Sequence, residues 1–154
     1  MRVILFLIFC ILLNHYVFAE DFTGKVISIT DGDTVTVLTD NKQIKVRLAE
    51  IDTPEKNQPY GKNAKKALSD FIFGKIVQIK FETIDRYGRT IGKIFLDNQN
   101  INKEMVKLGH AWVYIHYARD KTLFALEKEA RENQLGLWAL PETQRIAPWG
   151  VASR

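Results

Sequence analysis

The chain has 154 residues, with 22 Lys and Arg against 18 Asp and Glu and a formal net charge of +4. This length predicts a single domain, and the small basic excess is compatible with a polyanionic partner but does not establish one. The only cysteine, Cys10, lies in an apolar N-terminal run. The rest of the chain therefore excludes disulfides, a thiolate nucleophile and cysteine-ligated zinc.

The N-terminal residues have the pattern of an export signal. Arg2 gives a positive start, residues 3–13 are an unbroken apolar run, and Val17-Phe18-Ala19 puts small residues at the −3 and −1 positions of a cleavage site. We expect a signal peptide over residues 1–19, cleavage after Ala19, a secreted or periplasmic product, and no stable membrane association afterwards. The alternative is an uncleaved membrane anchor, which is disfavoured because the apolar run is short for a spanning helix.

Five segments rich in β-branched residues predict strands, at residues 22–30, 34–39, 43–49, 76–83 and 90–96. The first two are joined by Asp31-Gly32-Asp33, which is typical of a hairpin turn. In the third strand, apolar residues alternate with Lys45 and Arg47. We therefore expect Arg47 to project away from the core that its neighbours fill.

Three helices are expected from apolar residues at helical spacing. The first covers residues 64–72 and is closed by Gly74, the second covers residues 101–108 and ends at Gly109, and the third starts at Leu123 and stops near Gly136. The order of elements predicts an α+β fold, a five-stranded OB-fold barrel flanked by three helices, over residues 20–140. For the tail, residues 141–154, two outcomes remain open: Trp149 packs back on the body, or the end is frayed.

Carboxylates suited to a hard divalent cation cluster in two short motifs. Asp33 and Asp52 are oxygen donors of the kind that calcium prefers, and Thr53 could add its main-chain carbonyl because the following Pro54 favours an extended backbone. Glu55 lies three residues after Asp52, where a turn could aim it at water beside the metal as a general base. The alternatives are that the aspartates only form turns and that Glu55 is only a carboxylate in the first turn of a helix.

Two arginines supply the complementary charge. Guanidinium groups bind phosphate oxygens in a bidentate way and stay protonated at any working pH, so Arg47 and Arg89 are candidates to hold a phosphate. Each also has a simpler interpretation. Arg47 could form a solvated ion pair with Glu50, and Arg89 could be an ordinary cation at the tip of a hairpin.

Taken together, the motifs resemble those of the staphylococcal nuclease (thermonuclease) family over residues 25–140. The segments that carry the resemblance are Ile29-x-Asp31-Gly32-Asp33-Thr34, Arg47-Leu48-x-x-Ile51-Asp52-Thr53-Pro54-Glu55, Tyr60-Gly61, Asp85-x-Tyr87-Gly88-Arg89 and Leu135-Gly136-Leu137-Trp138. The resemblance implies a calcium-dependent nuclease that cuts DNA and RNA with little sequence selectivity and leaves 3′-phosphate ends. We expect a monomer.

By this resemblance, Asp33, Asp52 and the Thr53 carbonyl would bind Ca²⁺, and Arg47, Glu55 and Arg89 would be catalytic. Asp31 would help to hold water beside the metal, and Tyr87 and Tyr117 would contact the substrate.

Two departures from the family pattern limit the transfer. The segment from Glu55 to Tyr60 is shorter than the mobile loop of the best-known member, and Ile115 replaces one of its two stacking tyrosines. The alternative function is a non-catalytic OB-fold module that binds nucleic acid or a protein.

Overall fold

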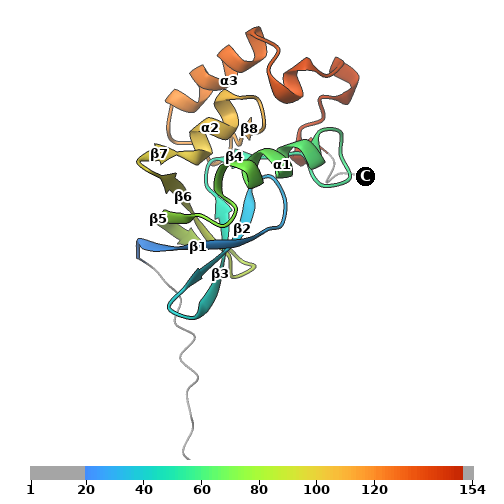
Figure 1. Cartoon of the computed structure of the whole chain (residues 1–154). Helices are drawn as coiled ribbons and strands as arrows, with labels where there is room; N and C mark the ends of the chain where they lie inside the picture. Colours follow the sequence, from blue (N-terminus) through green and yellow to red (C-terminus); the bar gives the residue numbers. More distant parts are fainter. Residues whose placement is uncertain (1–19, 151–154) are drawn as a thin grey trace, which may run out of the picture.

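The computed structural model describes residues 20–150, so the expected signal peptide over residues 1–19 lies outside the described residues. Within residues 20–150, no helix is long and apolar enough to cross a membrane. Figure 1 shows the barrel strands gathered at the lower end of the molecule, with α2, α3 and the C-terminal segment at the other end.

Five strands form a closed barrel: β1 (Phe22–Ile29), β2 (Thr34–Thr39), β3 (Lys42–Leu48), β5 (Ile76–Ile84) and β6 (Thr90–Leu96). β2 pairs antiparallel with β1 and with β3, and β5 pairs antiparallel with β1 and with β6. β6 runs parallel to β3, which closes the ring. The predicted five-stranded barrel is confirmed, and each strand agrees with its predicted range to within one residue.

The three predicted helices are present as α1 (Gly61–Ile72), α2 (Ile101–Lys107) and α3 (Thr122–Glu132). α3 ends before the predicted stop at Gly136, because Gln134 takes a left-handed conformation with φ of 53°. The helix carries two ion pairs between residues four apart, the half-buried Arg131–Glu127 pair and the exposed Lys128–Glu132 pair.

Periodicity did not predict three short strands, because segments of two residues are too short to show a pattern. β4 (Ile51–Asp52) pairs with β8 (Trp112–Val113), and β7 (Gln99–Asn100) pairs with the end of β6. The β4–β8 pair matters for the site, since it fixes the segment after β3 against the segment that leads into α3.

The barrel core is filled by aliphatic side chains from all five strands, from α1 and from α2. A buried asparagine ties the helical end to the barrel: Asn102 accepts a hydrogen bond from the Ile94 amide at 3.0 Å and donates to the carbonyl of Ala49 at 2.9 Å. Burying a polar side chain is stabilising only when its hydrogen bonds are made, and here they hold the start of the β3–β4 turn on β6.

The C-terminal segment packs on the body. Trp149 lies in the short 3-10 turn Pro148–Gly150, stacks on Tyr114 with ring planes 3° apart, and makes an edge contact with Trp112. Of the two outcomes left open for the tail, packing of Trp149 is the one observed.

Candidate active site

The turn between β1 and β2 holds a buried carboxylate. Asp33 is only 5% exposed, and its two oxygens accept hydrogen bonds from the Thr34 hydroxyl at 2.9 Å and from the Thr53 amide at 3.0 Å. Asp31 accepts the Asp33 amide at 3.2 Å, the bond expected of a turn former. Asp33 therefore does more than shape its own turn, because it links the hairpin to the segment that follows β4.

Arg47, on β3, is held rigidly beside these carboxylates. Its guanidinium donates to the main-chain carbonyls of Leu48 and Ile51, both at 3.1 Å, and lies 2.7 Å from Asp52 and 3.4 Å from Asp33. The side chain is 14% exposed. The ion pair expected in the simpler interpretation, with Glu50, is not the one that forms.

The group of three aspartates carries more negative charge than one arginine balances. Burial raises the pKa of Asp33 and of Asp52 above the usual range, although the nearby Arg47 opposes the shift. Burial and the neighbouring Asp33 carboxylate raise the pKa of Asp31 to about 6. An additional cation at this position would stabilise all three ionised carboxylates.

Glu55 lies at the rim of the same region, on the loop between β4 and α1. Its carboxylate is exposed and forms no ion pair with any residue in the described range 20–150. Because α1 begins only at Gly61, Glu55 is not in the first turn of a helix, and that interpretation is wrong. Two hydrogen bonds make the loop compact. The Glu55 amide donates to the Gln58 side chain at 2.6 Å, and the Gln58 main-chain amide donates to the Glu55 carbonyl at 2.8 Å.

Arg89 lies at the end of the β5–β6 hairpin and is oriented by Asp85. One oxygen of Asp85 accepts the amides of Tyr87 and Arg89 at 2.9 and 3.0 Å, and the other accepts the Arg89 guanidinium at 2.7 Å. Gly88 supplies the left-handed residue of the turn, with φ of 76°. Arg89 is therefore a cation at the tip of a hairpin, as the simpler interpretation holds, and its side chain also lines a cleft.

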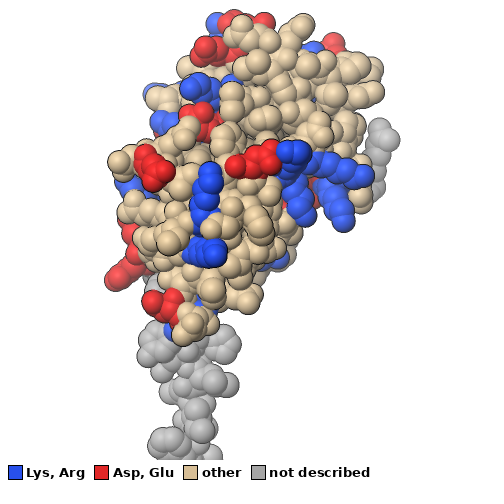
Figure 2. Space-filling model, in the orientation of Figure 1, with Lys and Arg blue, Asp and Glu red and all other residues tan. Residues whose placement is uncertain are grey.

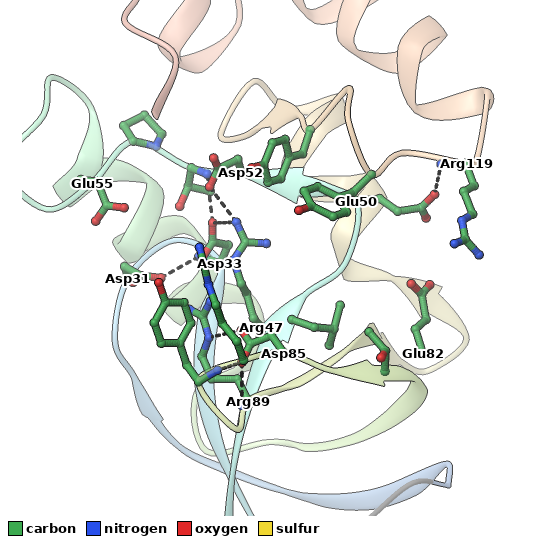
Figure 3. A pocket seen from close by; sticks show the side chains of 18 residues that line it. Asp31, Asp33, Arg47, Glu50, Asp52, Glu55, Glu82, Asp85, Arg89 and Arg119 are labelled. Atoms are coloured by element: carbon green, nitrogen blue, oxygen red, sulfur yellow. Dashed lines mark hydrogen bonds and ion pairs between the residues drawn. The ribbon is translucent and has the colours of Figure 1, made fainter. Parts of the chain in front are cut away.

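The structure brings every candidate residue to one cleft of about 810 Å³. Figure 3 shows Glu55 and Asp31 at one side of this cleft, Arg119 and Glu82 at the other, and Arg47 between them. Its lining contains all the residues proposed from the sequence: Asp31, Asp33, Arg47, Asp52, Thr53, Glu55, Tyr87, Arg89 and Tyr117. It also contains residues that no motif marked, notably Glu50, Glu82 and Arg119.

Two tyrosines with exposed rings line the cleft: Tyr87 is 71% and Tyr117 66% exposed. The Arg89 guanidinium lies 5.5 Å from the centre of the Tyr87 ring, and Tyr117 contacts Tyr114 edge to face. The exposed part of either ring could stack on a base. Tyr114 also lines the cleft, but one face of its ring is covered by Trp149. Tyr87 and Tyr117, the two tyrosines predicted to contact the substrate, therefore both line the cleft.

The lysines of α1 lie apart from the cleft. Figure 2 shows basic side chains gathered over this helix, where Lys62 and Lys66 are exposed and Lys65 is partly so. Lys66 pairs with Asp70 on the next turn. None of the three lysines lines the cleft.

The donor set suits a hard cation that keeps several waters. Within the described part of the chain, no three His, Cys, Asp or Glu side chains are grouped to hold a metal ion. Asp33 and Asp52 do converge on one guanidinium nitrogen, and Asp31 lies beside Asp33. Two carboxylates, a main-chain carbonyl and water form an all-oxygen set, which calcium and magnesium accept and softer metals do not favour.

The family model for staphylococcal nuclease homologues matches residues 45–140. The chain is 42% identical over 145 residues to a micrococcal nuclease of Shigella flexneri, covering 87% of this chain and 83% of that protein. It is 48% identical over 121 residues to an uncharacterized endonuclease of Haemophilus influenzae, covering 78% of this chain and 68% of that protein. A third relative, an uncharacterized endonuclease of Escherichia coli O157:H7, is 38% identical over 134 residues, 86% of each chain.

The chain therefore belongs to the staphylococcal nuclease family. The resemblance noted from the motifs is confirmed, and the names of these relatives support a hydrolytic nuclease function.

Proposed function

We propose that this protein is an exported, calcium-dependent nuclease that hydrolyses phosphodiester bonds of DNA and RNA with little sequence selectivity. One observation carries the proposal: a single cleft is surrounded by a carboxylate without an ion pair in residues 20–150, two oriented guanidinium groups, a buried aspartate and a half-buried one. Hydrolysis of a phosphodiester needs an activated water, neutralised phosphate oxygens and a fixed geometry of attack, and this cleft offers a group for each requirement.

In the proposed reaction, Glu55 takes a proton from the attacking water. The new P–O bond forms as the bond to the 5′ oxygen breaks. The 5′ oxygen takes a proton from solvent water and Glu55 later releases its proton to solvent, which leaves a 3′-phosphate and a 5′-hydroxyl. Arg47 and Arg89 bind the non-bridging oxygens, where negative charge increases in the transition state. Their hydrogen bonds to main-chain carbonyls and to Asp85 orient them before the substrate arrives.

For the metal, we infer Asp33, Asp52 and the Thr53 carbonyl as ligands, with Asp31 holding nearby water. A calcium ion bound there would polarise a phosphate oxygen and favour ionisation of water. In the structure, one guanidinium nitrogen of Arg47 lies between the carboxylates of Asp33 and Asp52. A metal would therefore compete for the carboxylates, leaving the guanidinium more available to phosphate.

Little sequence selectivity follows from the kind of contacts that the cleft offers. Guanidinium groups contact phosphates, which carry no sequence information, and tyrosine faces stack on any base. Export rests on the N-terminal pattern alone. N-terminal sequencing of the mature protein should find Glu20 first.

The proposal is tested by incubating the protein with end-labelled single-stranded DNA and RNA, with calcium or with a calcium chelator. We expect both substrates to be cut only with calcium, and the products to become substrates for a ligase or a polymerase only after removal of a 3′-phosphate. Binding without cleavage under all conditions would instead support the non-catalytic OB-fold module.

A further inference from the structure

The cleft extends well past the residues to which the proposed chemistry assigns a role. Beyond Arg47 it continues to an end lined by Glu50, Glu82 and Arg119 (Figure 3). One phosphate held between Arg47 and Arg89 does not require this end. The additional length raises the question of what the far end binds.

Arg119 differs from the arginines assigned to the scissile phosphate. Arg47 is paired with Asp33 and Asp52, and Arg89 is paired with Asp85. The Arg119 side chain is exposed in the cleft and makes no ion pair within residues 20–150. It is therefore a cation whose charge is free to meet an anionic ligand.

The acidic groups nearest to Arg119 in the chain and in the cleft are bound to other partners. Asp120 accepts the Thr122 hydroxyl at 2.6 Å and pairs with Lys103 at 2.9 Å. Glu82 lies 3.4 Å from the Lys93 ammonium. Among residues 20–150, therefore, no carboxylate forms an ion pair with the Arg119 guanidinium.

The backbone that carries Arg119 is fixed to the centre of the site. One oxygen of Glu50 accepts the amides of Arg119 and Asp120, at 2.6 and 2.8 Å, and the other oxygen lies 2.8 Å from the Lys93 ammonium. Glu50 is 6% exposed and occupies the turn between β3, which carries Arg47, and β4, which carries Asp52. The backbone at Arg119 is therefore tied to the turn that joins the strands of Arg47 and Asp52.

We propose that Arg119 binds a phosphate that flanks the scissile one on the same nucleic-acid strand. A guanidinium matches the geometry of a phosphate and forms two parallel hydrogen bonds to it. Tyr117, two residues earlier, offers a largely exposed ring on which the base of the adjoining nucleotide stacks. The inference rests on the proposed function. It predicts that the nuclease binds a nucleic-acid strand with several phosphates more tightly than a substrate with a single phosphodiester.

The first experiment compares wild type with Arg119→Ala on two substrates: a single-stranded oligodeoxynucleotide and a dinucleotide with one phosphodiester. On the oligonucleotide we expect KM to rise about tenfold, the loss of one good phosphate contact of roughly 1.4 kcal/mol, with kcat within twofold. On the dinucleotide the two proteins should have equal kinetics. Arg119→Lys should show a smaller rise in KM than Arg119→Ala, because lysine keeps the positive charge but cannot form the two parallel hydrogen bonds of a guanidinium.

Lys121→Ala is the matched control, since it removes one positive charge two residues after Arg119. The Lys121 side chain is exposed and does not line the cleft. This variant should leave both substrates unaffected. An equal rise in KM for Lys121→Ala would overturn the proposal in favour of a general effect of net charge. Equal KM values for Arg119→Ala and wild type on the oligonucleotide would also overturn it.

A second experiment locates the phosphate. Oligonucleotides with one cleavable bond carry a single neutral methylphosphonate at successive linkages around it. At one linkage the neutral group should weaken cleavage by wild type about tenfold and leave Arg119→Ala unchanged. Losses of the same size for both proteins at every linkage would refute the contact. If wild type cut no substrate at all, the proposed function itself would fail. If wild type and Arg119→Ala were both active with the same kinetics, only the contact of Arg119 would be refuted.

Discussion

Glu50 is the buried carboxylate that holds the far end of the cleft in place, and its replacement gives a test with a calculable size. Glu50→Ala removes the acceptor of two main-chain amides and one partner of Lys93. Glu50→Gln keeps an acceptor oxygen of the same shape but removes the charge. The pair of variants separates the hydrogen bonds from the ion pair.

The magnitude follows from the contacts. A hydrogen bond to a charged acceptor contributes about 1.5–3 kcal/mol, and an amide left without a partner adds to the loss. The Lys93 side chain is 27% exposed, so its ion pair contributes about 1 kcal/mol or less. At the low end of these ranges the two hydrogen bonds and the ion pair together contribute about 4 kcal/mol. We therefore expect Glu50→Ala to lower the free energy of unfolding by about 4 kcal/mol, roughly 12 °C in Tm, and Glu50→Gln by about 1 kcal/mol.

The assay is urea denaturation of wild type and both variants between pH 3 and pH 7. Burial opposes ionisation of Glu50, but Lys93 and the amides of Asp120 and Arg119 outweigh it and hold the pKa of this carboxyl below its ordinary value of 4.5. The folded state therefore favours the ionised form, and this contribution is complete above pH 4.5 and lost as the pH falls through the folded pKa. The stability difference between wild type and Glu50→Gln should shrink on acidification.

Two results would refute this account of Glu50. One is a loss below about 0.5 kcal/mol for Glu50→Ala, the size expected of an ordinary surface substitution. The other is a difference between wild type and Glu50→Gln that grows as the pH falls from 5 to 3.

Three further predictions concern the position of the catalytic groups and the metal. In Gly61→Ala the new Cβ would lie only 1.9 Å from the Glu55 carbonyl oxygen, so the loop that carries Glu55 must move. Steady-state kinetics should then show a fall in kcat of about tenfold or more, whereas an unchanged kcat would show that the position of this loop is unimportant. Asp85→Asn should raise KM and lower kcat by loosening Arg89, with a loss approaching that of Arg89→Ala; full activity would contradict the orienting role. Calcium at about 100 times its Kd should raise the free energy of unfolding of wild type by about 2.7 kcal/mol, measured by thermal denaturation. Asp52→Asn should remove most of this stabilisation, whereas equal stabilisation of both proteins would place the metal elsewhere.

The barrel could be predicted from the sequence because its signals are local. Alternating residues such as those around Arg47 mark strands, and glycines such as Gly74 and Gly109 mark helix ends, so the five strands and three helices were found nearly at their observed bounds. The two-residue strands β4 and β8 were missed. Their pairing depends on contacts between residues that are far apart in the chain, which no local pattern reveals.

The candidate site was predictable where motifs carry chemistry and unpredictable where tertiary contacts decide. The Asp-Gly-Asp turn and the segment from Arg47 to Glu55 contain residues that do line one cleft, while their roles stay predictions. The partners of Arg47 could not be inferred, because its ion pairs join three separate elements. Glu50 looked like an exposed polar residue, and only the folded chain brings the amides of residues 119 and 120 to its carboxylate.

The most direct test of the central claim is the single-turnover rate of cleavage of labelled single-stranded DNA by wild type and Glu55→Gln in calcium. The exposed carboxylate makes no ion pair in the described structure, so the variant should have the same Tm as wild type. We expect its cleavage rate to fall by a factor of about 10²–10⁴, the usual contribution of a general base. A rate within a few-fold of wild type would contradict the assignment of Glu55 and the account of this cleft as the catalytic centre.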